Sequence, residues 1–186
     1  MIFDTHTHSY FPEISDRQDE IITHMINNKV CYATQIGCDE HTSKQAIELA
    51  HAHECFFATV GYHPTEGQSL MREDIPKIVE QLGQLVVTHA QKIVAIGEIG
   101  FDYYHLDPEK SEEQKETQRL LFLSMTELAI KHDLPIVVHS REARADTLRY
   151  IKESGIKKVI IHCFSEDYDF AQELMDYSDE VYFSFS

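Results

Sequence analysis

The sequence predicts a parallel α/β fold, and three observations support this prediction. Short runs rich in β-branched residues alternate with longer amphipathic segments along the chain. Several of the short runs, such as Ile93–Ile96 and Ile136–Val138, are apolar throughout, which is typical of parallel strands buried on both faces. Connections from helix to strand are tight, whereas the connections from strand to helix at Tyr62–Met71 and Gly100–Ser111 are long. Because α/β folds build their sites in the loops after the strands, functional residues are expected there.

Strands are expected where β-branched and aromatic residues dominate a short run. In chain order, the seven expected strands are Ile2–His6, Val30–Gly37, Cys55–Gly61, Lys92–Glu98, Pro135–His139, Lys158–His162 and Glu180–Phe185. The segments between them are long enough to hold helices, as parallel pairing of successive strands requires.

Helices are expected between the strands, where apolar residues recur with helical spacing. In chain order, the six expected helices are Asp16–Asn28, Thr42–His53, Arg72–His89, Glu112–His132, Arg141–Ser154 and Asp167–Tyr177. Ser15 and Gln18 have the spacing of a capping box at the start of the first helix. Gly155 lies where the C-cap of the fifth helix is expected. The fourth helix carries a core-facing stripe formed by Leu121, Met125, Leu128 and Ala129.

The chain is predicted to be a single domain over residues 1–186, because no repeat, linker or break in composition divides it. A closed (β/α)8 barrel needs eight strands in about 250 residues, so this chain stops too soon for one. The open edges of the first and seventh strands are therefore expected to favour association over a stable monomer.

Composition narrows the class of protein further. No apolar run approaches a membrane span, and no basic segment followed by an apolar one opens the chain, so neither a membrane contact nor a secretory signal is expected. The formal net charge of −16 disfavours phosphate polyanions unless local groups reverse it. The four cysteines form no CxxC pair and indicate reduced thiols in a cytoplasmic protein. The 12 histidines, against 16 Lys and Arg together, direct attention to metals.

Histidines and one glutamate stand at the ends of four expected strands. His6 and His8 lie two residues apart at the end of the first strand, so their side chains share a face. Glu98, His139 and His162 each end a further strand. Because the carboxyl ends of parallel strands meet at one edge, we expect these side chains to converge and to bind divalent metal.

The types of ligand indicate which chemistry the site supports. Histidine with carboxylate suits Zn²⁺ or Mn²⁺, and added carboxylates favour Mg²⁺. The two oxygens of Glu98 allow it to bridge two ions, and Gly97 and Gly100 leave room beside it. Two ions about 3.5–4 Å apart clamp a phosphoryl group and activate a water, so hydrolysis is favoured over redox chemistry.

Five motifs carry a resemblance to a known family. They are Asp4–His8, Val60–Pro64, Gly97–Tyr103, Val138–Glu142 and Ile161–Ser165. In order and spacing they resemble the successive signatures of the TatD family of metal-dependent deoxyribonucleases. The resemblance implies an α/β fold of the TIM-type (β/α)8 barrel class, incomplete here, with seven strands present and the eighth strand and final helices absent.

The resemblance also implies a function and a set of site residues. It implies two divalent metal cations (Mg, Mn or Zn) and hydrolysis of DNA phosphodiester bonds, often from the 3′ end. The metal ligands that it implies are His6, His8, Glu98 (bridging), His139 and His162. It places His63 and Arg141 at the mouth as candidate contacts to phosphate. DNA as a partner rests on the resemblance alone, because composition does not suggest it.

The chain departs from the family pattern at its end. The family carries a metal-binding Asp after the eighth strand, usually assigned as the base for the nucleophilic water, and this sequence ends at Ser186, after the seventh expected strand. Two expectations follow: either the natural coding sequence continues, or the chain is a metal-binding remnant that no longer catalyses.

Two other enzyme classes share part of this residue pattern. Amidohydrolases of small amides or esters often use a carboxylated lysine where this chain has Glu98. Phosphoesterases of the PHP type also open with His-x-His but lack the later motifs.

Several residues allow a structural interpretation beside the functional one. His63 is either a functional contact or a loop histidine, and Arg141 either forks to phosphate or pairs with a neighbouring acid such as Glu142. The Asp102–Tyr104 segment either stacks a base and its sugar or packs locally.

Overall fold

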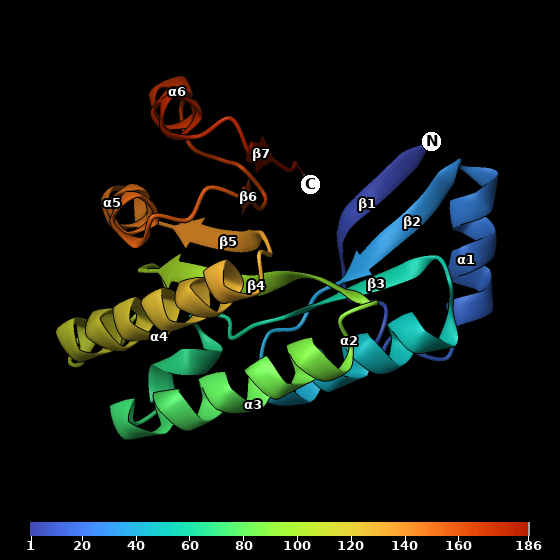
Figure 1. Ribbon diagram of the computed structural model, residues 1–186, viewed down its shortest axis with the longest axis horizontal. Coiled ribbons are helices and arrows are strands. Elements are labelled where there is room, and N and C mark those ends of the chain that lie inside the picture. The colour runs from blue at the N-terminus through green and yellow to red at the C-terminus, as the bar shows by residue number, and fades with distance from the viewer. Residues whose placement is uncertain (186) are drawn as a thin grey trace.

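The computed structural model, which describes residues 1–185, is a seven-stranded parallel sheet curled into half a barrel (Figure 1). The strands follow one another in the order β1-β2-β3-β4-β5-β6-β7, and each pairs in parallel with the next. This confirms the predicted seven-stranded, barrel-type fold. The strands are β1 Ile2–Thr7, β2 Val30–Gln35, β3 Phe56–Val60, β4 Ile93–Asp102, β5 Ile136–Arg141, β6 Val159–Ile161 and β7 Val181–Phe183.

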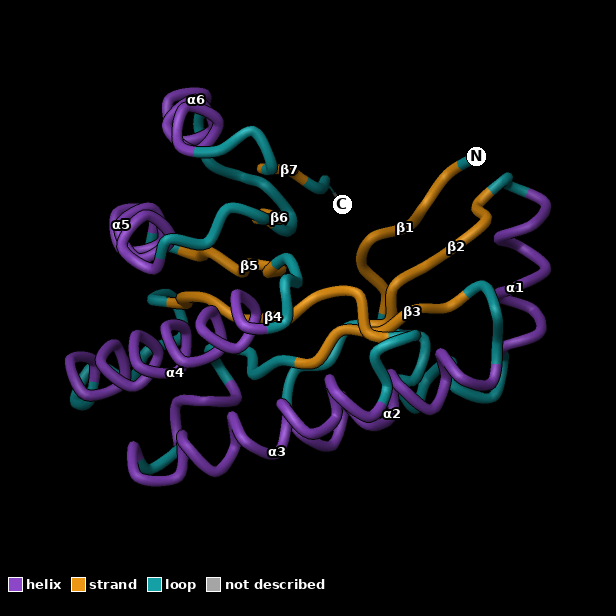
Figure 2. The backbone as a smooth tube through the Cα atoms, viewed as in Figure 1, coloured by secondary structure: helices purple, strands orange, loops and turns teal. Residues whose placement is uncertain are grey.

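The helices cover the convex side of the curled sheet, as Figure 2 shows. The α-helices are α1 Gln18–Asn27, α2 Glu40–Ala52, α3 Ile75–Thr88, α4 Ser111–Lys131, α5 Arg144–Ser154 and α6 Tyr168–Tyr177. Two short 3₁₀ helices, η1 Glu66–Ser69 and η2 Arg72–Asp74, precede α3. Within residues 1–185, β1 and β7 are the two ends of the curl and do not pair with each other. None of the helices in this range is long and apolar enough to span a membrane.

The core lies between the sheet and these helices. The predicted stripe of α4 is buried, with Leu121, Met125 and Ala129 at most 2% exposed. Phe101 of β4 packs against Phe122 of α4 and stacks on the Tyr150 ring of α5, with ring centroids 4.9 and 5.5 Å away. Burial of each large apolar side chain stabilises the fold by about 1.5–3 kcal/mol, so this layer holds the strand ends in place.

The helix ends differ in part from the sequence prediction. The capping box expected at Ser15 and Gln18 is wrong: α1 begins after Arg17 without a side-chain cap, and the Gln18 amide donates to the Ser9 carbonyl at 2.5 Å instead. A capping box forms at α2, where Asp39 accepts from the Thr42 amide at 2.7 Å. Gly155 ends α5 with φ +79°, as predicted.

Strands β4 and β5 continue further than predicted, and this extension shapes the site. Phe101 and Asp102 remain paired with Ser140 and Arg141, so Arg141 belongs to a strand and does not begin a helix. Gly100 permits the extension, because its φ is +145° and a Cβ there would lie 2.0 Å from the His139 carbonyl oxygen. Only a residue without a side chain fits this close approach.

Candidate metal centre

The side chains predicted as metal ligands converge on the edge formed by the carboxyl ends of the strands. Strands β1, β4 and β5 supply His6, Glu98 and His139, while His8 and His162 directly follow β1 and β6. Residues 1–185 contain three groups of possible ligands, and within each group the ligand atoms lie within 4.8 Å of one another. Glu98 belongs to all three groups. The groups are His6–Glu98–His162, His8–Cys38–Glu98 and His63–Glu98–His139.

Glu98 is the centre of the cluster, with its side chain only 5% exposed. One carboxylate oxygen, Oε2, lies 3.3 Å from His6 Nε2. The other, Oε1, lies 3.1 Å from His139 Nδ1 and 3.8 Å from His63 Nε2. The two oxygens therefore face histidines from different strands, as a bridging carboxylate requires.

Glu98 carries its charge despite its burial. Burial by itself raises the pKa of a carboxyl group, but hydrogen bonds from His139 and His6 hold the pKa of Glu98 well below its usual range. A buried carboxylate without such partners would take up a proton. At neutral pH Glu98 is thus an ionised carboxylate surrounded by imidazoles.

The tautomer of His8 is set by Tyr10. The hydroxyl of Tyr10 donates to the carbonyl of Ile36, so it accepts from His8 Nδ1, which lies 3.0 Å away. With its proton on Nδ1, His8 presents the lone pair of Nε2, 3.1 Å from His6 Nε2. Such a partner on the second ring nitrogen is usual for metal-binding histidines, because it fixes tautomer and ring orientation.

The donor set fits a divalent cation. The lone pair of His8 Nε2 and the carboxylate of Glu98 both face His6 Nε2, so two acceptors share a single proton there. His6 Nδ1 is buried without a hydrogen-bond partner among residues 1–185. The His162 ring stacks on His6 with centroids 3.4 Å apart. The lone pairs of these nitrogens and of the carboxylate therefore outnumber the protons available to them, and a bound cation would accept those lone pairs.

Two of the histidines are neutral at physiological pH. Burial lowers the pKa of both His63 and His162 to about 4. Burial also lowers the pKa of His139, but hydrogen bonds to Glu98 and Asp102 outweigh this effect and raise it above the ordinary histidine value. Both ring nitrogens of His139 face carboxylate oxygens, so a cation would compete with a proton there, whereas the neutral rings of His63 and His162 each offer one unprotonated nitrogen.

Asp102 forms a second layer behind His139 that the sequence interpretation missed. Its side chain is 1% exposed, and Oδ2 accepts from His139 Nε2 at 3.0 Å and from His105 Nδ1 at 2.9 Å. Gln118 of α4 fixes the Asp102 backbone through two hydrogen bonds of 3.0 Å. The spacing could have indicated this residue, because Asp102 follows Glu98 by four positions in the same long strand, β4.

The two residues predicted to contact phosphate lie in different surroundings. His63 belongs to the cluster: its Nδ1 is 2.7 Å from the Thr65 hydroxyl, and its Nε2 points toward Glu98. Arg141 lies at the exposed end of β5, with its guanidinium 4.1 Å above the ring of Tyr104. The structure thus separates a half-buried His63 from an exposed Arg141 at the rim, and Tyr104 stacks on Arg141.

Cys38, which the sequence interpretation did not single out as a ligand, also reaches the cluster from the loop after β2. Burial raises the pKa of its thiol to about 12.

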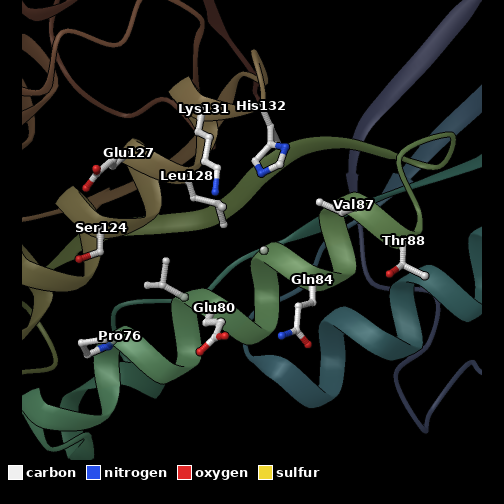
Figure 3. A pocket seen from close by; sticks show the side chains of 12 residues that line it. Pro76, Glu80, Gln84, Val87, Thr88, Ser124, Glu127, Leu128, Lys131 and His132 are labelled. Carbon is white, nitrogen blue, oxygen red and sulfur yellow. The ribbon is translucent and has the colours of Figure 1, made fainter.

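A separate hollow of about 700 Å³ lies between α3 and α4 (Figure 3), lined by side chains such as Val87 and Leu128. None of the clustered residues at the carboxyl ends of the strands lines this hollow.

Seven parallel strands curled into half a barrel, with a histidine–carboxylate cluster near their carboxyl ends, define a protein of the α/β-barrel class. The chain belongs to the TatD-related DNase family, whose family model matches residues 3–186. The resemblance found in the motifs is thereby confirmed.

Individual relatives agree with this family. The chain is 33% identical over 177 residues to YabD of Bacillus subtilis, described as an uncharacterized metal-dependent hydrolase, covering 94% of this chain and 65% of that protein. It is 32% identical over 142 residues to the deoxyribonuclease Tat-D of Schizosaccharomyces pombe, covering 72% and 44% of the two chains. The crystal structure of YjjV, a TatD homologue from Escherichia coli K12, superimposes with a TM-score of 0.85 at 24% identity, covering 98% of this chain and 66% of that one. The chain therefore spans about two thirds or less of the length of these relatives.

Proposed function

We propose that this chain forms the metal-binding part of a TatD-type hydrolase that cleaves DNA phosphodiester bonds with two divalent cations. The observation that carries the proposal is the placement of Glu98, whose two oxygens face histidines from opposite sides of the cluster. We infer that residues 1–186 act as a single domain. The name of the Schizosaccharomyces pombe relative supports DNA as the substrate.

The residues that would hold the cations are those at the strand ends. His6, His8 and His162 would serve one side of Glu98, and His139 the other. With neutral imidazoles in the majority and one carboxylate between them, the donor set favours Zn²⁺ or Mn²⁺ over Mg²⁺. When bound, such cations supply Lewis-acid polarisation of a phosphoryl oxygen and acidify a water.

The remaining residues of the site orient the metal-binding side chains or bind the phosphate of the substrate. Asp102 holds the ring of His139 in place through Nε2, so that Nδ1 faces Glu98. The fork of Arg141 fits a phosphate oxygen pair, and its stacking on Tyr104 restricts its motion. Because the net charge of −16 repels DNA as a whole, binding depends on these local contacts at the end of a strand. Attack from the 3′ end is part of the proposal through the family resemblance.

The test measures metal content and turnover of the purified full chain. Oligonucleotides labelled at either end, and a generic phosphodiester, are incubated with chain loaded with Mn²⁺, Zn²⁺ or Mg²⁺. We expect turnover that chelation abolishes, loss of nucleotides from the 3′ end first, and a decline in rate with rising salt.

Glu98→Gln is the decisive variant, because a neutral amide bridges poorly. It should lower bound metal toward one or no ion per chain, while the surface variant His24→Gln should retain the wild-type content. Full occupancy in Glu98→Gln would contradict the bridging role. Metal binding without turnover of any ester, amide or DNA would favour the non-catalytic interpretation, and turnover of a small amide or ester alone would favour the amidohydrolase one.

A further inference from the structure

Cys38 occupies a position at the metal centre that the implied ligand set does not include. It follows β2, and both polar groups of its backbone are held: the amide donates to the Thr42 hydroxyl at 2.9 Å, and the carbonyl accepts from the His63 amide at 2.8 Å. These contacts fix the Cα position of Cys38 between the start of α2 and the loop after β3. The direction of its side chain is therefore set by the fold.

The thiol shares its surroundings with His8. The Tyr10 hydroxyl, which accepts from His8 Nδ1 at 3.0 Å, also lies close enough to the Cys38 side chain to influence the pKa of its thiol. A ring nitrogen of His8, Sγ of Cys38 and a carboxylate oxygen of Glu98 all lie within 4.8 Å of one another. His8 and Cys38 follow β1 and β2, and Glu98 lies within β4, so the curl of the sheet brings one nitrogen, one sulfur and one oxygen donor together.

We propose that Cys38 is a ligand of the cation that His8 and Glu98 hold, which gives this centre one thiolate donor. The proposal rests on the metal centre of the proposed function and adds a residue to it. On binding, the S–H bond breaks heterolytically, the proton goes to solvent, and the sulfur electron pair is donated to the cation, with no change of oxidation state. A sulfur donor selects Zn²⁺, Co²⁺ or Fe²⁺ and disfavours Mg²⁺.

The thiolate gives a signature that is independent of catalysis. Co²⁺ bound to sulfur shows a sulfur-to-metal charge-transfer band in the near ultraviolet, whereas Co²⁺ bound to nitrogen and oxygen alone does not. Metal-free full-length chain is titrated with Co²⁺ and followed by absorption, and binding is measured separately by competition with a chelator. The matched control is Cys55→Ser, because Cys55 precedes β3 at the opposite edge of the sheet.

Wild type and Cys55→Ser are expected to develop the band in step with Co²⁺ binding. Cys38→Ser should lose the band but still bind Co²⁺, with affinity lower by about tenfold or more, since loss of even an outer-sphere partner costs about 10–100-fold. Its affinity for Mg²⁺ should change less than about twofold, because Mg²⁺ gains little from sulfur.

Each other outcome is informative. Co²⁺ binding by wild type without the band, or a band that survives in Cys38→Ser, overturns the thiolate ligand and leaves the proposed metal centre intact. A wild-type chain that binds no Co²⁺ overturns both. If Cys38→Ser does not fold, protection of the wild-type thiols replaces it: Zn²⁺ should slow alkylation of Cys38, mapped by mass spectrometry, and equal alkylation with and without Zn²⁺ contradicts the proposal.

Discussion

Asp102→Asn tests whether a buried carboxylate behind His139 orients the metal centre. The carboxylate accepts three hydrogen bonds: Oδ2 from His139 Nε2 at 3.0 Å and His105 Nδ1 at 2.9 Å, and Oδ1 from the His105 amide at 2.9 Å. Asparagine preserves the shape but replaces one acceptor with an NH₂ donor. Whichever way the amide is turned, at least one of the three donors then faces another donor.

The size of the effect follows from these contacts. Losing a hydrogen bond to a charged group costs about 1.5–3 kcal/mol. His139 retains its contact with Glu98 at 3.1 Å, so the chain should fold while the ring loses its fixed tautomer. Removal of the outer partner of a metal-binding histidine lowers metal affinity about 10–100-fold, or about 1.4–2.7 kcal/mol. The pKa of His139 should also fall, because the Asp102 hydrogen bond helps to raise it.

The assay is a competition titration of metal-free chain against a chromophoric chelator with Mn²⁺ or Zn²⁺, and histidine NMR reports the pKa of His139. The control is Asp146→Asn, since Asp146 is also a hydrogen-bonded carboxylate, accepting from the Tyr103 hydroxyl at 2.6 Å, but does not touch the cluster. Metal affinity within about twofold of wild type in a folded Asp102→Asn chain, or an equal loss in Asp146→Asn, would refute the orienting role.

Four further predictions concern the site and the fold. Arg141→Ala should raise KM for a polynucleotide and leave metal content unchanged, and an unaltered KM would remove Arg141 from the site. Because His139 has a raised pKa and gives up its proton to bind metal, affinity should fall about tenfold per pH unit as pH drops below that pKa, and a flat affinity profile would contradict this. Gly100→Ala should destabilise the chain by about 3 kcal/mol in urea unfolding through strain and overpacking, whereas Gly155→Ala, with no atom within 4 Å of its added Cβ, should cost only about 1–2 kcal/mol. The exposed Phe3 lies on β1, whose outer edge has no partner strand among residues 1–185, and should promote association, so Phe3→Lys should increase the monomer fraction in sedimentation; no change would argue against this edge as the contact.

The sequence predicted the fold class and the family because both are written in local patterns. Apolar runs and the segments between them identify parallel strands and helices without knowledge of their packing. His6 and His8 share a strand face by spacing alone. Glu98 and His139 lie in the carboxyl-terminal halves of β4 and β5, and His162 follows β6, so parallel pairing brings all three toward one edge. Their role as metal ligands stays a prediction, but their proximity in space follows from topology.

Boundaries were predicted less well because tertiary contacts decide them. Strand β4 extends to Asp102 because β5 supplies hydrogen-bonding partners as far as Arg141, and a register shift between Ile96 and Ile99 changes the alternation of its side chains. No local pattern reveals that shift. The failed capping box has the same origin, since Gln18 bonds to the distant Ser9 carbonyl in preference to the helix end.

By itself, then, the sequence determined the strand order, the family and the residues at the strand ends. Only the tertiary structure decided which other groups join them: Asp102 behind His139, His63 beside Glu98, and Cys38 next to His8. Strands β2 and β4 are not neighbours in the sheet, since β3 lies between them. Cys38 and Glu98 meet across β3 because the sheet curls, and curvature arises from twist and packing summed over many strands, which no short segment of sequence encodes.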